Sequence, residues 1–128
     1  MLRLILVPTA PAELLDKVAI LEVKEERIID PEKLKNVRHE LELLRQIAKN
    51  QIPPSPELNK LFSKLRTLSE KGWDIEDGKR DCERRQDFGP RFIELARGAF
   101  KNNDERATIK KQINLLLKSD IVEEKSYT

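Results

Sequence analysis

Cysteine and histidine are almost absent from the chain, whose 128 residues contain one of each, Cys82 and His39. A single cysteine cannot close a disulfide within the chain, and zinc sites need several Cys or His ligands at short spacing. The two residues fall in different predicted helices, so no cysteine–histidine nucleophile pair is expected. Cys82 lies at the edge of an apolar helical stripe, which predicts a reduced core residue in a cytoplasmic protein.

Glycine-rich loops and long apolar runs are also lacking. With four glycines in all, the chain has no phosphate-binding loop, no serine nucleophile motif and no strand–helix alternation typical of a dinucleotide fold. The apolar run in residues 1–7 stops at Pro8, short of the roughly 20 residues that span a bilayer and too short for a signal peptide. It predicts a short N-terminal extended strand or arm and no membrane span.

Charge is plentiful but balanced. Charged and hydrophobic residues each make up 38% of the chain, and 25 basic against 23 acidic residues leave a net charge of +2. No overall field therefore draws the chain to nucleic acid or to a membrane surface. Acidic residues interleave with the arginines of the second half, so duplex nucleic acid is not an expected partner.

Proline spacing predicts the helices, because proline at the first helical position fixes the entry dihedral without losing a hydrogen bond. Cap or turn residues precede four prolines: Thr9 before Pro11, Asp30 before Pro31, Ser55 before Pro56 and Gly89 before Pro90. The predicted helices span about residues 11–29, 31–50, 56–87 and 90–118. We expect a mainly α single domain over residues 1–128, a bundle of about four long antiparallel helices, unless the third helix breaks at Gly72 or the fourth at Asn103.

The first predicted helix is apolar on two sides. One side carries Leu14, Val18, Leu21 and Ile28, and the opposite side carries Ile20 and Val23. Such a helix is normally sandwiched, either at the centre of a domain or at a subunit interface. On this basis the chain is predicted to form a homodimer.

The apolar stripes of the last two helices become polar halfway along without losing phase. The first stripe contains Leu58, Leu61, Phe62, Leu65 and Leu68 and runs on into Glu76, Arg80 and Glu83; the second contains Phe92, Leu95, Ala96 and Ala99 and runs on into Asn103, Arg106, Lys110 and Asn114. Burying an unpaired charge costs more than a helix gains from packing. These side chains must therefore pair with one another, bind a ligand or reach water.

This reasoning predicts a non-enzymatic binding or interaction module with a polar cleft between helices, for an anionic small molecule or protein partner. Its candidate ligand-binding residues are Trp73, Asp74, Glu76, Asp77, Arg80, Asn103, Arg106 and Lys110. The cations among them would recognise the anionic group, Trp73 would offer a stacking surface, and the carboxylates would orient the cations.

Two alternatives stay open. Glu22 and Glu25, three residues apart on one helix, could join Glu76 and Asp77 to hold Mg²⁺ in a hydrolase acting on a nucleotide, with no other cofactor indicated. The polar stripe could instead be an internal salt-bridge network in a purely structural dimer. No catalytic residue follows from the sequence, and whether the chain is an enzyme stays open.

Several separated segments resemble a family of small uncharacterised bacterial and phage proteins, classed as a domain of unknown function. The matching segments are residues 11–17, 20–24, 26–28, 73–77, 92–97, 103–106 and 123–127. The resemblance covers nearly the whole chain and implies no known activity. Some relatives are associated with surface-polysaccharide or glycosyltransferase genes, which implies a context without a mechanism.

A fainter likeness is to the all-α nucleoside triphosphate pyrophosphohydrolases, which hold Mg²⁺ between acidic side chains of a helical bundle. Glu22, Glu25 and Glu26 would stand for the first acidic group of that family, and Glu76 with Asp77 for the second. The order of the acids departs from the family pattern, which opens with adjacent glutamates followed by another three residues on.

Overall fold

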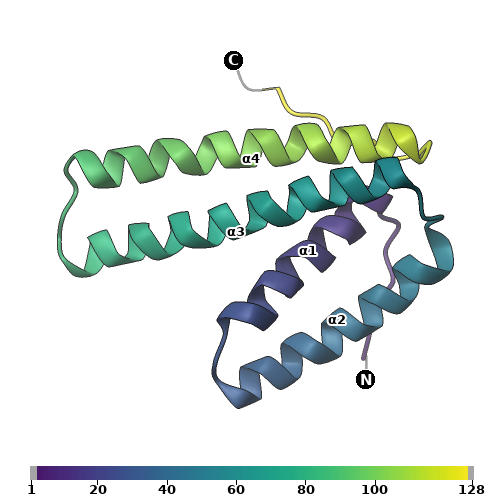
Figure 1. The fold of residues 1–128 in the computed structure, drawn as a ribbon, viewed down its shortest axis with the longest axis horizontal. Helices are drawn as coiled ribbons and strands as arrows, with labels where there is room; N and C mark the ends of the chain where they lie inside the picture. The colour runs from purple at the N-terminus through teal and green to yellow at the C-terminus, as the bar shows by residue number, and fades with distance from the viewer. Residues whose placement is uncertain (1–2, 127–128) are drawn as a thin grey trace.

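The computed structural model describes residues 3–126, which form four helices (Figure 1). They are α1 (Pro11–Arg27), α2 (Pro31–Gln51), α3 (Pro56–Arg84) and α4 (Pro90–Leu116). The predicted mainly α class and helical bundle are confirmed, and each helix ends within three residues of its predicted end. Tyr127, at the end of the last family-like segment, lies outside the described residues.

Each helix begins at a proline, as the spacing predicts. Asp30 accepts a hydrogen bond from the Lys33 amide at 3.0 Å, and Ser55 accepts one from the Leu58 amide at 3.1 Å. The prediction of Thr9 as a cap is wrong, because Ala10 occupies the N-cap of α1 and has no capping side chain. The hydrogen bond that a cap would make comes instead from α4, as described below.

The two predicted long helices are continuous: α3 and α4 run unbroken through Gly72 and Asn103, where a break was the alternative. A Cβ on Gly72 would lie 3.4 Å from Oδ1 of Asn102. The Asn102 amide in turn donates to the carbonyl of Leu68 at 2.9 Å. Gly72 therefore lies against Asn102 of α4 within a continuous helix.

The helices form two antiparallel pairs, and α1 lies at the centre (Figure 1). The long α3–α4 pair is crossed at one end by the shorter α1–α2 pair, and α1 packs against each of the other three helices. One core cluster unites α1 with α3 and α4 through Ala12, Leu15, Ala19, Leu58, Leu65 and Ile113, and a second unites α1 with α2 through Val18, Leu21, Val37 and Leu41. Both apolar sides of α1 are thus covered within the chain, so the two-sided pattern gives no reason for a dimer.

The N-terminal segment has no regular structure. Residues 3–10 form neither helix nor strand, so the predicted strand is not found there, and the side chains of Leu4, Ile5, Leu6 and Val7 are exposed. Within the described part of the chain, no helix is long and apolar enough to cross a bilayer.

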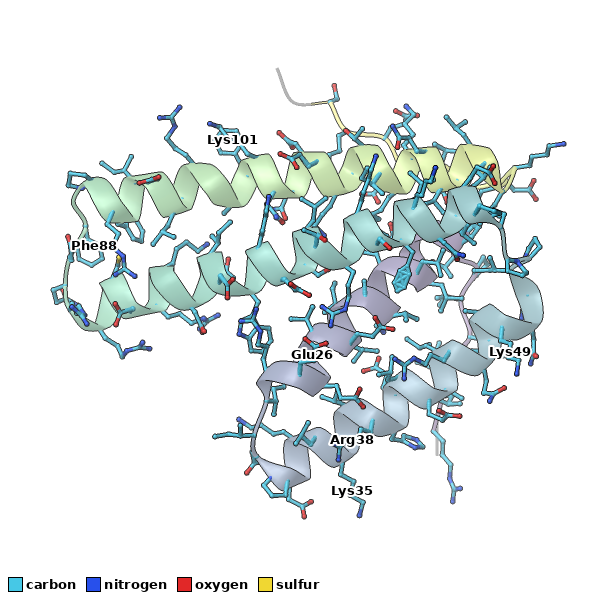
Figure 2. The ribbon with its side chains drawn as sticks, in the orientation of Figure 1. Glu26, Lys35, Arg38, Lys49, Phe88 and Lys101 are labelled. Atoms are coloured by element: carbon cyan, nitrogen blue, oxygen red, sulfur yellow. The ribbon has the colours of Figure 1, made fainter. Side chains whose placement is uncertain are left out.

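The far end of the α3–α4 pair is a two-helix hairpin that extends beyond α1 and α2 (Figure 1). Cys82 is fully buried there, in keeping with its predicted role as a core residue, and a Cβ on Gly78 would meet Leu95 at 2.9 Å. At the turn, where Figure 2 labels Phe88, the rings of Phe88 and Phe92 meet edge to face with centroids 5.5 Å apart. The tip of the hairpin therefore has a small core of its own.

Replacing Ile113 by alanine tests the main core cluster. Ile113 is fully buried, and removing its side chain should lower the free energy of unfolding by about 2–5 kcal/mol through lost burial and a residual cavity. Leu115→Ala, at an exposed position on the same helix, is the matched control and should cost about 0.5 kcal/mol or less. Urea unfolding measures both values, and equal losses would contradict this assignment of the core.

The hairpin turn should respond to acid through Asp81. The Arg91 guanidinium donates to this carboxylate at 2.9 Å and holds its pKa below the usual value. A carboxyl whose pKa is lowered on folding stabilises above its unfolded pKa of about 4, and this contribution disappears as pH falls through the folded pKa. Asp81→Asn should therefore lower the melting temperature at pH 7, and the difference from the parent should shrink as the pH falls below the unfolded pKa of about 4. Asp120→Asn, outside the hairpin, is the control; a difference for Asp81→Asn that persists unchanged at low pH would refute the linkage.

Candidate functional site

A cavity of about 420 Å³ lies where α1, α3 and α4 meet. Its lining comprises Ile20 from α1, Ser69, Gly72, Trp73, Ile75, Glu76, Asp77 and Arg80 from α3, and Ala99, Asn102, Asn103 and Arg106 from α4. Six of the eight predicted ligand-binding residues are among them: Trp73, Glu76, Asp77, Arg80, Asn103 and Arg106. Glu76 and Arg80 from one polar stripe and Asn103 and Arg106 from the other thus line a common space, whereas Glu83, Lys110 and Asn114 are not part of its lining. Whether a ligand occupies that space stays a prediction.

A buried ion pair supports one side of this cavity. Nη2 of Arg106 lies 2.8 and 2.7 Å from the two carboxylate oxygens of Asp16, and Asp16 is only 6% exposed. One nitrogen serves both oxygens, so the pair does not use the two-pronged guanidinium–carboxylate geometry. The remaining N–H groups of Arg106 are left for other acceptors.

Two buried polar atoms beside the cavity lack a partner among the described residues. They are Nε of Arg106 and Oγ of Ser69, and both residues line the cavity. A buried donor without an acceptor costs about 1–3 kcal/mol, so native proteins seldom leave one unmet. An acceptor that reached these two buried atoms from the cavity, whether in a ligand or in water, would remove this cost.

At the rim of the cavity, Glu76 does not orient Arg80 as the sequence predicts. Glu76 is bonded to Lys79 at 2.8 Å and its side chain is 51% exposed, so it neither pairs with Arg80 nor is buried. Arg80 itself has no ion-pair partner within residues 3–126. Trp73 is half-buried, whereas Asp77 and Asn103 are exposed.

Two predicted residues lie away from the cavity. Asp74 accepts a hydrogen bond from Arg27 of α1 at 2.7 Å, and this bond raises the pKa of the Arg27 guanidinium. Lys110 lies near the start of α1, where Nζ is 2.6 Å from Glu13 and 3.7 Å from Asp16. It also lies 3.7 Å from Glu123 of the C-terminal segment. Lys110 therefore ties α4 to α1 and to that segment.

The start of α1 is capped by α4. The Ala12 amide, one of those that a helix start leaves without an internal partner, donates to Oδ1 of Asn114 at 3.0 Å. Asn114 is 3% exposed, so this bond is shielded from water. It replaces the local cap that α1 lacks.

The carboxylates of the proposed magnesium site are dispersed. Glu22 binds Arg45 at 3.0 Å and Arg66 at 3.2 Å, and Glu25 lies 3.5 Å from Arg38, which Figure 2 labels on α2. Glu76 and Asp77 line the cavity instead. Nowhere in residues 3–126 do three or more His, Cys, Asp or Glu side chains gather in a group that could hold a metal ion.

Sequence reasoning missed three residues that shape the site. Asp16, Ser69 and Asn102 are all buried, yet none was a candidate. Helical phase offered a signal for each. Asp16 is four residues after Ala12 and three before Ala19, Ser69 directly follows the apolar stripe of α3, and Asn102 continues the spacing of Leu95 and Ala99 better than Asn103 does.

A family model described as a family of unknown function, DUF6165, matches residues 5–128. The chain belongs to DUF6165. This confirms the resemblance to a domain of unknown function, while the bacterial or phage origin stays a prediction. No curated protein and no solved structure matches the chain. Because DUF6165 comes with no described activity, a function has to be argued from the cavity itself.

Substituting the buried and the exposed acid in the same way tests this description. Asp16→Asn leaves Arg106 without its counter-charge and should cost about 3–5 kcal/mol of unfolding free energy. Glu76→Gln removes the same charge at a half-exposed position and should cost under about 1 kcal/mol. Urea unfolding at pH 7 compares the two variants. A small loss for Asp16→Asn would show that the pair is solvated.

Proposed function

We propose that this chain is a non-enzymatic binding module whose cavity between α1, α3 and α4 takes a small anionic ligand. The observation that carries the proposal is the pair of unmet buried hydrogen-bond donors, Arg106 Nε–H and Ser69 O–H, on two residues that line that cavity. A volume of about 420 Å³ lies within the range of small-molecule sites, roughly 300–1,000 Å³.

Charge at the cavity favours an anion at one position. Asp16 neutralises Arg106, and Lys79 neutralises Glu76, so neither pair attracts a charged group strongly. Arg80 alone among the lining cations has no partner in the described chain. A carboxylate or phosphate accepting from Arg80, with further bonds from Ser69 and Arg106, would use donors that are otherwise idle.

The rest of the cavity lining is largely apolar, which favours a ligand with an apolar part. Ile20, Ile75 and Ala99 contribute apolar surface, and half-buried Trp73 adds an aromatic one. A ligand with an apolar or ring-shaped body beside its anionic group fits this mixture better than a bare inorganic ion. Asp77, exposed at the rim, adds one acceptor for a hydroxyl or amine of the ligand.

The roles differ from those inferred from sequence for three residues. Asp74 and Glu76 hold Arg27 and Lys79 and so do not orient the cations of the site. Lys110 belongs to the contacts between α4, α1 and the C-terminal segment. Asp16 is the acid that positions Arg106. The cytoplasm remains the expected compartment, on the strength of the single buried thiol.

Thermal melts with a panel of small carboxylates, phosphates and nucleotides, each with and without Mg²⁺, test the proposal. A ligand that binds only the folded chain stabilises it, by about 2.7 kcal/mol at one hundred times its Kd. We expect at least one anion with an apolar body to raise the Tm without Mg²⁺. Arg80→Gln and Ser69→Ala should abolish the rise, because each removes one donor from the cavity.

Arg84→Gln is the matched control, since Arg84 lies one helical turn from Arg80 and does not line the cavity. It should retain the full rise. A purely structural polar network would give no rise with any compound. A rise that needs both a nucleotide and Mg²⁺, and that Glu22→Gln abolishes, would support the hydrolase in place of this proposal.

A further inference from the structure

The outer face of the first half of α4 carries an apolar stripe that nothing in the described chain covers. Ile93, Ala96 and Phe100 follow one another at steps of three and four residues and all are exposed, Ile93 and Phe100 to 55% each. The residues that face α3, Leu95, Ala99 and Asn102, lie on the opposite side of the same helix. In Figure 1 no other helix lies against this outer face.

The second half of α4 is covered differently. Lys111 contacts Glu124 at 3.3 Å, and Asp104 lies 3.9 Å from Lys125, so the C-terminal segment follows α4 there. The stripe lies before Asp104, beyond these contacts. A hollow beside it is lined by Pro90, Ile93, Glu94, Arg97, Gly98 and Lys101, all from α4.

Three charged residues flank the stripe on one side. Glu94, Arg97 and Lys101 follow one another at steps of three and four residues, and all are exposed. Within residues 3–126 none of the three has an ion-pair partner. Figure 2 shows Lys101 pointing away from α3. The flank therefore carries a negative charge at Glu94 and a positive charge at Lys101, two helical turns apart. Both can form ion pairs with another molecule.

We propose that this face binds a second copy of the chain, with two α4 helices packed antiparallel about a two-fold axis near Arg97. Such an axis maps each flank onto the same flank of the partner. Residues at nearly equal distances before and after Arg97 then meet, so Ile93 lies against the partner's Phe100 and Glu94 beside the partner's Lys101, and the two Arg97 side chains come together at the axis. Each apolar and each charged contact forms twice.

Charge complementarity selects this partner and this orientation. A parallel pair would place Glu94 of each copy at the same level, away from both Lys101 side chains. In the antiparallel pair each Glu94 lies between the partner's Lys101 and the two Arg97 side chains at the axis, so both acidic side chains have cations on either side and offset the approach of the two arginines. Two large apolar side chains per copy make a small interface, so the association is weak and concentration-dependent. The inference is independent of the proposed ligand.

Charge exchange tests the inference. Sedimentation equilibrium of the parent, from about 1 µM to 1 mM, should show a monomer–dimer equilibrium. Glu94→Lys and Lys101→Glu should each weaken dimerisation about tenfold or more, because each creates two like-charge contacts. The double variant Glu94→Lys with Lys101→Glu restores opposite charges at the two contacts between positions 94 and 101 and should bind itself more tightly than either single variant, but less tightly than the parent because a lysine at position 94 lies near the partner's Arg97.

Ile93→Asp should also abolish the dimer, whereas Ile29→Asp, at an exposed isoleucine between α1 and α2, should leave it intact. All these positions are exposed, so circular dichroism should show the same helix content throughout. A parent that stays monomeric over the whole range overturns the inference. So does a dimer that both single charge variants and Ile93→Asp leave unchanged, since it would then use another face.

Discussion

Polar side chains of α4 hold α1 in the centre of the bundle. Arg106 pairs with buried Asp16, and Asn114 accepts from the amide of Ala12, so α1 obtains both a counter-charge and its helix cap from a segment about 100 residues away. Apolar contacts alone would let α1 slide, because they depend little on direction. A buried ion pair does not allow this, since separating the partners leaves a charge without compensation. The position of α1 along α4 is therefore fixed by these two bonds.

The same arrangement joins stability to the candidate site. Asp16 engages Arg106 through Nη2 and leaves Nε beside the cavity, next to the hydroxyl of Ser69. A change at Asp16 would alter the fold and the donor set of the cavity together. Arg80 and Ser69 differ in this respect, because no ion pair in the described chain depends on them. They therefore report on binding with less risk to the fold.

The helices were predictable from sequence because their determinants are local. Proline at the first turn, with Asp30 and Ser55 as caps, places helix starts whatever the rest of the chain does. Much of the cavity lining was predictable too, since an unbroken helical phase carries Trp73, Arg80 and Arg106 to the face that the apolar stripes define. The partners of these residues were not. Asp16 pairs with Arg106 because of how α1 and α4 pack, and Glu76 pairs with Lys79 because of the side-chain rotamers that the two residues adopt. Helical periodicity gives no information on either.

The unequal lengths of the helices explain where the molecule leaves apolar surface. α3 and α4 have 29 and 27 residues, about 40 Å each at 1.5 Å per residue, whereas α1 and α2 have 17 and 21 residues, about 25–32 Å. The shorter pair crosses the longer one at a single end, so the far end of the hairpin has only two helices (Figure 1). In a pair of packed helices, each helix buries only the face that contacts the other helix. Leu95 lies against Gly78 of α3 and Phe92 against Phe88 of the turn, whereas Ile93 and Phe100 are left on the outside. The two apolar sides of α1, which the sequence makes conspicuous, are covered inside the chain, whereas the outer face of α4 and the side chains of residues 4–7 are left without cover in the described chain.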